Sequence, residues 1–441
     1  MTKRDNELST AKIGRRGIIE AGGLMGLAAA TSSIPLVNVW GAEASTIKIG
    51  WIGAKSGWLA NFNVPDAWVM EKVKASFKNG LSIGGKNYAV EIVVKDNQSD
   101  NNVSATVSNE LVLRDRCDLI LAANGAAVLS IGPLADARSV PALSTMAPWQ
   151  AFVIGRGAMP GPDYKGFPFS FHIGFGVGEM LTNYVAMWDE MPTNKLVGTF
   201  WQDDPAGRSF GSPQMGVPAV AAKAGYKEVQ GGFFQMATND FSNQISAFKN
   251  AGAEIVVGYT SPEQMVVFLN QMAQSRYQPK ICTIAGAPLF PASVEALGSH
   301  GDGLTTEVWW TPDWPYKSSI TGQSARELAD DWEKGSGQQW TQPLGYLMAV
   351  WEAGLAALKN SGDPKNKVGV RDAIKNLDME TITGRVNFKG THIPSVAITP
   401  MAGGQWRLNN GGKYKYELLV VSNKTSPDIP VQDKVKPLAL S

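Results

Sequence analysis

The side chains that most often carry out catalysis are present in this chain of 441 residues, but they do not form a catalytic or metal-binding motif. The three histidines, His172, His300 and His392, lie far apart and lack the spacing of metal ligands. No serine lies in a G-x-S-x-G elbow, and the sequence contains neither an H-E-x-x-H zinc motif nor a phosphate-binding P-loop. We therefore predict that the protein is not an enzyme and that it binds neither a metal nor a cofactor.

Polar and aromatic residues are instead placed where short apolar runs end. The runs 196–201 and 255–258 end in this way, and the segment 241–250 between them has its apolar side chains on one helical face. Strands that alternate with such helices bury themselves as a parallel sheet covered by helices. Because ligands of these sheets bind beyond the carboxyl ends of the strands, the pattern predicts an α/β fold with a binding site at the strand ends.

The two cysteines are predicted to be buried free thiols. Cys117 opens an apolar run in the first half of the chain, and Cys282 lies at the start of another in the second half. A chain of this length exceeds what one core usually holds, so the two halves are expected to be separate lobes. Sulfurs in separate lobes cannot meet within the Cα separation of about 7 Å that a disulfide allows.

The region 196–270 resembles the type I periplasmic binding proteins of the branched-chain amino acid and amide ABC importers. The resemblance is carried by the helix opening Asp240-Phe241-Ser242 and by the strand end Gly258-Tyr259, which in that family lines the ligand cleft. Similar motifs extend it over roughly residues 47–419. The resemblance implies two doubly wound α/β lobes joined by a hinge of three strands, and a ligand that is enclosed when the lobes close.

The resemblance also implies where the chain passes from one lobe to the other. The first lobe is expected at 45–172 and 308–383, the second lobe at 175–305 and 385–421, and a C-terminal tail at 422–441. The crossings are expected near 172–174, near 305–310 and near 383–385. The hinge residues implied by these crossings are His172, Gly174 and Gly384.

The N-terminus predicts export from the cytoplasm. Arg15 and Arg16 precede a weakly apolar run at 21–37, and Ala42-Glu43-Ala44 offers a cleavage site, so residues 1–44 are predicted to be a signal peptide. The arginine pair resembles a twin-arginine export signal, with an ordinary Sec signal as the alternative. No cysteine lies near the cleavage site for a lipid anchor, so we expect a soluble periplasmic protein. Since redox enzymes use the twin-arginine route, a redox enzyme is the enzymatic alternative, although no cofactor motif supports it.

The expected partners are a small-molecule ligand and the permease and ATPase of an inner-membrane ABC importer. A protein that senses the ligand and passes the signal to a receptor is the alternative within the same fold. Without residues 1–44 the chain has equal numbers of basic and acidic residues, and no basic stripe is visible, so nucleic acid is not expected as a partner. We expect a monomer.

The resemblance places the ligand contacts in the loops at the strand ends. The residues expected there are Trp58, Phe62, Asn124, Gly125, Ala126, Ser144 and Thr145 in the first lobe, Trp201, Asp203, Asp204, Tyr259, Thr260 and Ala287 in the second, and Trp310 at a crossing. Some have structural alternatives. Trp201 is also suited to capping the sheet, the two aspartates to capping a helix, and only one of Trp309 and Trp310 is expected to face inward.

Two departures from the amino-acid binders of this family bear on the ligand. Those binders place hydroxyl residues where this chain has 124–127, and a glutamate where it has 286–288. A buried ammonium without a carboxylate partner costs several kcal/mol, and Asp203 or Asp204 is the candidate replacement. The many aromatic residues favour an uncharged or carboxylate-bearing ligand with an apolar or aromatic portion. A branched-chain or other amino acid is the alternative ligand.

Overall fold

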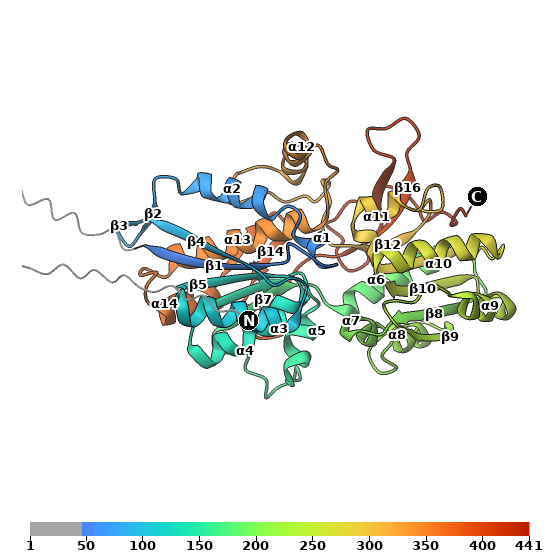
Figure 1. Ribbon diagram of the computed structural model, residues 1–441, viewed down its shortest axis with the longest axis horizontal. Helices are drawn as coiled ribbons and strands as arrows, with labels where there is room; N and C mark the ends of the chain where they lie inside the picture. The colour runs from blue at the N-terminus through green and yellow to red at the C-terminus, as the bar shows by residue number, and fades with distance from the viewer. Residues whose placement is uncertain (1–45, 441) are drawn as a thin grey trace, which may run out of the picture. The chain divides into compact units, whose positions relative to one another are not determined.

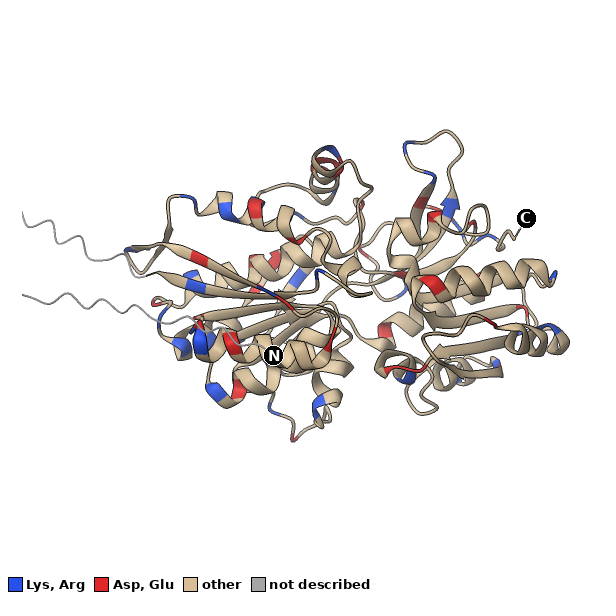
Figure 2. Ribbon diagram, viewed as in Figure 1, with Lys and Arg blue, Asp and Glu red and all other residues tan. Residues whose placement is uncertain are grey.

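The computed structural model describes residues 46–440, so the predicted signal peptide at 1–44 lies outside the described residues. Two large sheets, each covered by helices on both faces, make up the described part of the chain (Figure 1). We call the six-stranded sheet with its helices the first lobe and the seven-stranded sheet with its helices the second lobe. Figure 2 shows basic and acidic residues interspersed over the elements of both.

The first lobe has a fully parallel sheet. Across the sheet, the strands are β15 (Val396–Ile398), β7 (Ser170–Gly174), β6 (Ala142–Thr145), β5 (Leu119–Ala123), β1 (Ile47–Gly53) and β4 (Val90–Asp96). Strands such as β5 are apolar along their whole length because helices cover both faces of the sheet.

Helices on the two faces of this sheet come from distant parts of the chain. Helix α13 (Pro343–Asn360) covers one face together with α2 (Asp66–Ser76), and α3 (Asn101–Asn109) and α4 (Gly125–Arg138) cover the other. The other helices of the first lobe are α1 (Ala60–Asn63), the π-helix η1 (Glu110–Arg114), α5 (Trp149–Val153), the 3-10 helix η2 (Ile154–Arg156), α12 (Ala325–Ser336) and α14 (Lys367–Lys375). Two hairpins complete the lobe, β2 (Leu81–Ile83) with β3 (Lys86–Tyr88) and β13 (Asp378–Thr381) with β14 (Gly384–Asn387).

The second lobe has five parallel strands and two antiparallel strands at one edge. In order, they are β17 (Tyr416–Ser422), β16 (Ala402–Leu408), β12 (Thr305–Val308), β11 (Ile281–Gly286), β10 (Ile255–Thr260), β8 (Leu196–Gln202) and β9 (Lys227–Phe234). The helices are α6 (Val177–Asp189), α7 (Pro205–Phe210), α8 (Val217–Lys223), α9 (Ser242–Ala251), α10 (Pro262–Gln274) and α11 (Pro291–Glu295). The predicted α/β architecture is confirmed.

The chain passes between the lobes three times within residues 46–440. It does so after β7, after β12 and after β15. The third crossing differs from the one expected at 383–385, because β15 pairs with β7 and extends the first sheet, so the chain crosses at 399–401. Gly384 is therefore a turn residue of the β13–β14 hairpin and not a hinge. Its φ of +118° favours glycine, and a Cβ there would lie 2.8 Å from the Pro400 ring.

The two cysteines belong to different lobes and are both buried and free. Cys117 lies just before β5 of the first sheet, and Cys282 lies in β11 of the second. Burial raises the pKa of the Cys117 thiol to about 12, and it raises that of Cys282 as well. Neither thiol is therefore activated as a nucleophile.

The segment that follows β17 packs along the second lobe without helix or strand. Ile429 and Leu438 are buried, and the Leu438 amide donates a hydrogen bond to the Lys280 carbonyl over 2.9 Å. Within residues 46–440, no helix has both the length and the apolar character of a membrane span.

Candidate ligand-binding site

A cavity of about 100 Å³ lies where the loops at the strand ends of the two lobes meet, and we call it the interlobe pocket. The first lobe contributes loop and helix residues near the ends of β1 and β6, and the second lobe contributes residues near the ends of β8, β10, β11 and β12. The principal lining residues are Trp58, Leu59, Phe62, Met146, Phe175, Phe210, Tyr259, Leu289, Glu307 and Trp309.

Aromatic rings form most of the wall and connect the two lobes. Phe62 meets Trp58 edge-on at 6.0 Å, lies nearly parallel to Trp309 at 5.9 Å, and contacts Phe290 of the second lobe edge-on at 4.9 Å. Trp309 also packs against Phe175 with ring centroids 4.5 Å apart. Such a wall favours a ligand with a flat or apolar body, because rings gain stability by stacking in offset or edge-on geometry.

One acid, Glu307 of β12, lines the pocket. Its Oε1 accepts a hydrogen bond from the Gly286 amide over 3.0 Å, and its Oε2 accepts from the Thr306 hydroxyl over 3.1 Å and from the Tyr184 hydroxyl. Burial raises the pKa of Glu307, and the three donors act in the opposite direction. Glu307 was not predicted from the sequence, although a lone acid in the buried strand Thr305–Val308 is a signal that could have found it.

Several buried polar atoms near the pocket have no hydrogen-bond partner among the described residues. The Nε1 donor of the lining residue Trp309 is one of them, and the hydroxyls of Thr260 and Ser261, which follow Tyr259 in the chain, are two more. A buried donor without a partner costs about 1–3 kcal/mol. The Trp309 indole is therefore a natural donor to a bound ligand.

The sequence matches the family described as periplasmic binding protein over residues 46–413. The chain belongs to this family. Among solved structures, this periplasmic binding protein is similar to an ABC transporter substrate-binding protein from Sphaerobacter thermophilus, at 17% identity and a TM-score of 0.69 over 86% of this chain and 97% of that one. A leucine binding protein from Thermotoga maritima is 17% identical, with a TM-score of 0.63 over 86% of this chain and 99% of that one.

A third similar structure is a solute binding protein of an ABC transporter from R. palustris in complex with 4-hydroxybenzoate. It is 15% identical, with a TM-score of 0.68 over 87% of this chain and 98% of that one. At such identities the likeness shows a shared fold. The predicted type I periplasmic binding fold is confirmed.

Three of the predicted contact residues line the interlobe pocket of this periplasmic binding protein, namely Trp58, Phe62 and Tyr259. Trp310 does not, because its ring packs on Trp340 and its Nε1 donates to the Ile382 carbonyl over 3.2 Å. Trp309 faces the pocket in its place, since successive side chains of an extended segment point to opposite sides. Contact of these residues with a ligand stays a prediction.

The predicted residues after β5 and at the end of β6 do not line the pocket. Asn124 caps α4, accepting from the Ala127 amide over 3.1 Å, and it also hydrogen-bonds the side chains of Asn97 and Asn63, each over 3.0 Å. Gly125 and Ala126 form the first turn of α4. Asn124 is thus a structural residue, and it holds Asn63, the neighbour of Phe62, in place.

The hydroxyls of β6 are used inside the first sheet. Thr145 Oγ1 donates to the Ile173 carbonyl over 2.8 Å, and Ser144 Oγ lies 2.9 Å from Nδ1 of His172. His172 is fully buried, donates from Nε2 to the Ala147 carbonyl, and has its pKa lowered by burial to about 4. Of the hinge candidates, Gly174 is the one at the first crossing, where a Cβ would lie 2.6 Å from the His172 ring.

The predicted residues after β8 also have structural partners. Trp201 lines a separate small cavity and packs parallel to Phe210 at 6.4 Å. Asp203 pairs with Arg208 over 2.7 Å, and Asp204 caps α7 by accepting from the Gly207 amide over 2.8 Å. Neither aspartate lines the pocket, and a role of either one in place of the glutamate of the amino-acid binders stays a prediction. Ala287 is buried in a short turn after β11.

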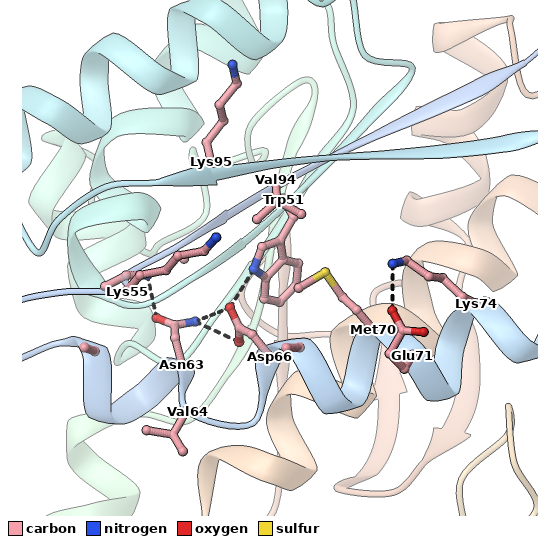
Figure 3. Close-up of a pocket in the computed structure, with 14 residues that line it drawn as sticks. Trp51, Lys55, Asn63, Val64, Asp66, Met70, Glu71, Lys74, Val94 and Lys95 are labelled. Atoms are coloured by element: carbon pink, nitrogen blue, oxygen red, sulfur yellow. Dashed lines mark hydrogen bonds and ion pairs between the residues drawn. The ribbon is translucent and has the colours of Figure 1, made fainter.

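A larger cavity of about 500 Å³ lies within the first lobe, between β1, β4 and the helices α1 and α2, and we call it the Asp66 groove (Figure 3). Trp51 Nε1 donates to Asp66 Oδ2 over 2.7 Å, and the Asn63 amide donates to both carboxylate oxygens over 3.1 Å. Lys74 points to Glu71, with which it forms an ion pair over 2.8 Å. Every lining residue belongs to one lobe, so closure of the lobes would not enclose a ligand there.

The buried carboxyl group of Asp66 is expected to make the stability of the protein depend on pH. Burial raises its pKa from 3.8 to about 7, although the Asn63 and Trp51 hydrogen bonds oppose the shift. Between these two pKa values the unfolded chain loses the proton and the folded chain keeps it. The protonated Asp66 therefore contributes to the unfolding free energy below pH 4, and this contribution is lost as the pH rises through 7. We expect Asp66→Asn to lack this decline.

Chemical denaturation of the wild type and of Asp66→Asn between pH 4 and 8 measures this difference. Glu71→Gln is the matched control, because Glu71 lines the same groove but is exposed and paired with Lys74. The control is expected to keep the wild-type decline. Parallel curves for the wild type and Asp66→Asn would show that Asp66 titrates as it does in water.

Proposed function

We propose that this chain is the periplasmic solute-binding subunit of an ABC importer and has no catalytic activity of its own. The observation that carries the proposal is the interlobe pocket, an aromatic cavity built from both lobes beside two of the three crossings between them, those after β7 and β12. Two lobes joined by short crossings can close around a solute by a hinge motion. The closed form would then be presented to the permease and ATPase in the membrane.

The lining of the pocket favours a small organic solute with an apolar or aromatic portion. The Trp309 ring contacts both Phe62 and Phe175 in the wall of the cavity, and a flat ligand can join this cluster. The similar protein in complex with 4-hydroxybenzoate is in keeping with such a ligand, and the similar leucine binding protein keeps an amino acid as the second candidate. The export signal predicted at 1–44 agrees with a periplasmic location and lies outside the described residues.

A thermal-shift screen over amino acids, amides, aromatic acids and small alcohols tests the proposal. A ligand at about 100 times its Kd adds about 2.7 kcal/mol to the stability of the folded state. We expect stabilisation by solutes with an apolar or aromatic portion, reduced in Phe62→Ala and retained in Asp66→Asn. Hits that depend on Asp66 and not on Phe62 would place binding in the Asp66 groove and contradict the proposal.

A further inference from the structure

The interlobe pocket has an acidic end without a basic counterpart. Glu307 is the one carboxylate among its lining residues, and no lysine, arginine or histidine lines it. Two other acids of the second lobe are engaged outside the pocket, Asp203 with Arg208 and Asp204 with the first turn of α7. A charged group of the ligand would therefore meet the Glu307 carboxylate alone.

The hydrogen bonds to Glu307 leave one acceptor position open. A carboxylate has about four lone-pair positions on its two oxygens. Oε2 already accepts from two hydroxyls, those of Tyr184 and Thr306, whereas Oε1 accepts only from the Gly286 amide. Burial raises the pKa of this carboxyl group, and these donors oppose the rise. The open position on Oε1 is thus suited to a donor brought by the ligand.

The Trp309 indole, in contrast, requires a hydrogen-bond acceptor from the ligand. Its Nε1 is a buried donor in the same pocket, without a partner among the residues described. Together, the open acceptor on Glu307 and the free donor on Trp309 require a ligand that both donates and accepts. Hydroxyl and carboxamide groups do both, whereas an ammonium offers three donors and no acceptor and a carboxylate offers acceptors only.

We propose that the ligand of this pocket carries a neutral hydroxyl or carboxamide group, bound between Glu307 and Trp309, on an apolar or aromatic body. This inference rests on the proposed function and narrows it. It disfavours the carboxylate-bearing ligands that the sequence left open, because a ligand carboxylate would lose its water beside Glu307 with no basic residue among the lining residues to pair with it. It also disfavours an ammonium, two of whose three donors would have no partner in an aromatic wall.

Four probes that share one ring and differ in the attached group test the inference by titration calorimetry at pH 7.5. They are benzyl alcohol, benzamide, benzylamine and benzoate. For the wild type we expect the alcohol and the amide to bind at least about 10-fold more tightly than benzoate, since the carboxylate of benzoate would be desolvated without a basic partner. Glu307→Gln is expected to raise the affinity for benzoate and to lower that for benzylamine.

Asp203→Asn is the matched control, because it also removes one carboxylate of the second lobe but lies outside the pocket. It should leave the order of the four probes unchanged. Preference of the wild type for benzoate or for benzylamine would overturn the inference while leaving the proposed function intact. Binding of none of the four at millimolar concentration would count against the proposed function itself. The order in which the wild type binds the four probes tests the inference even if Glu307→Gln does not fold.

Discussion

Replacing Trp309 with alanine is expected to weaken ligand binding by at least about 30-fold, the loss of about 2 kcal/mol typical of a central aromatic contact. Trp309 packs against Phe62 at 5.9 Å and Phe175 at 4.5 Å, so its loss opens the aromatic wall at the junction of the lobes. Trp309→Phe keeps a ring but removes Nε1 and should cost less. Calorimetric titration with the best solute from the thermal-shift screen measures both.

Trp310→Phe is the matched control for this prediction. Trp310 is the next residue and is equally buried, but it donates to the Ile382 carbonyl and lies outside the pocket. The substitution should lower stability, since it breaks a buried hydrogen bond, and should leave affinity unchanged. If Trp310→Phe weakened binding and Trp309→Ala did not, the orientation of the two tryptophans would be the reverse of the one described.

Asn124→Ala is expected to lower the unfolding free energy by about 3–5 kcal/mol, because buried polar groups lose partners, a helix cap is lost and alanine disfavours a positive φ. The amide of Asn124 connects Asn97, Asn63 and the first turn of α4, and its φ is +94°. Asn124→Gly removes the same side-chain amide but tolerates the positive φ, so the difference between the two variants isolates the cost of the backbone strain.

Chemical denaturation measures both variants. A loss of less than about 1 kcal/mol in Asn124→Ala would be within the range of ordinary surface substitutions and would contradict the structural role of this amide network. Because Asn63 follows Phe62 in α1, the same network positions the first-lobe wall of the pocket. Asn124, whose contact with the ligand stays a prediction, thus supports the wall of the pocket through Asn63.

The fold could be predicted from the sequence because its signals are local. The apolar runs at 196–201 and 255–258 and the amphipathic segment 241–250 lie in β8, β10 and α9. The third crossing was misplaced because Gly384 is a turn glycine, and only the pairing of β15 with β7 shows that the chain remains in the first sheet.

The site was predicted in part because its residues depend on contacts between distant segments. Aromatic residues near the strand ends, such as Trp58 and Tyr259, line the pocket, and these positions could be predicted from the sequence. Asparagine and aspartate serve equally as helix caps, and Asn124 and Asp204 are caps because backbone amides lie within reach. Glu307 was missed because its pocket forms only when the two lobes come together.

A crystal structure of the protein with the best solute from the screen tests the central claim most directly. The account predicts density for the solute in the interlobe pocket, against the rings of Phe62 and Trp309 and within hydrogen-bond distance of Glu307. A solute bound in the Asp66 groove, or at any site formed by one lobe alone, would contradict it.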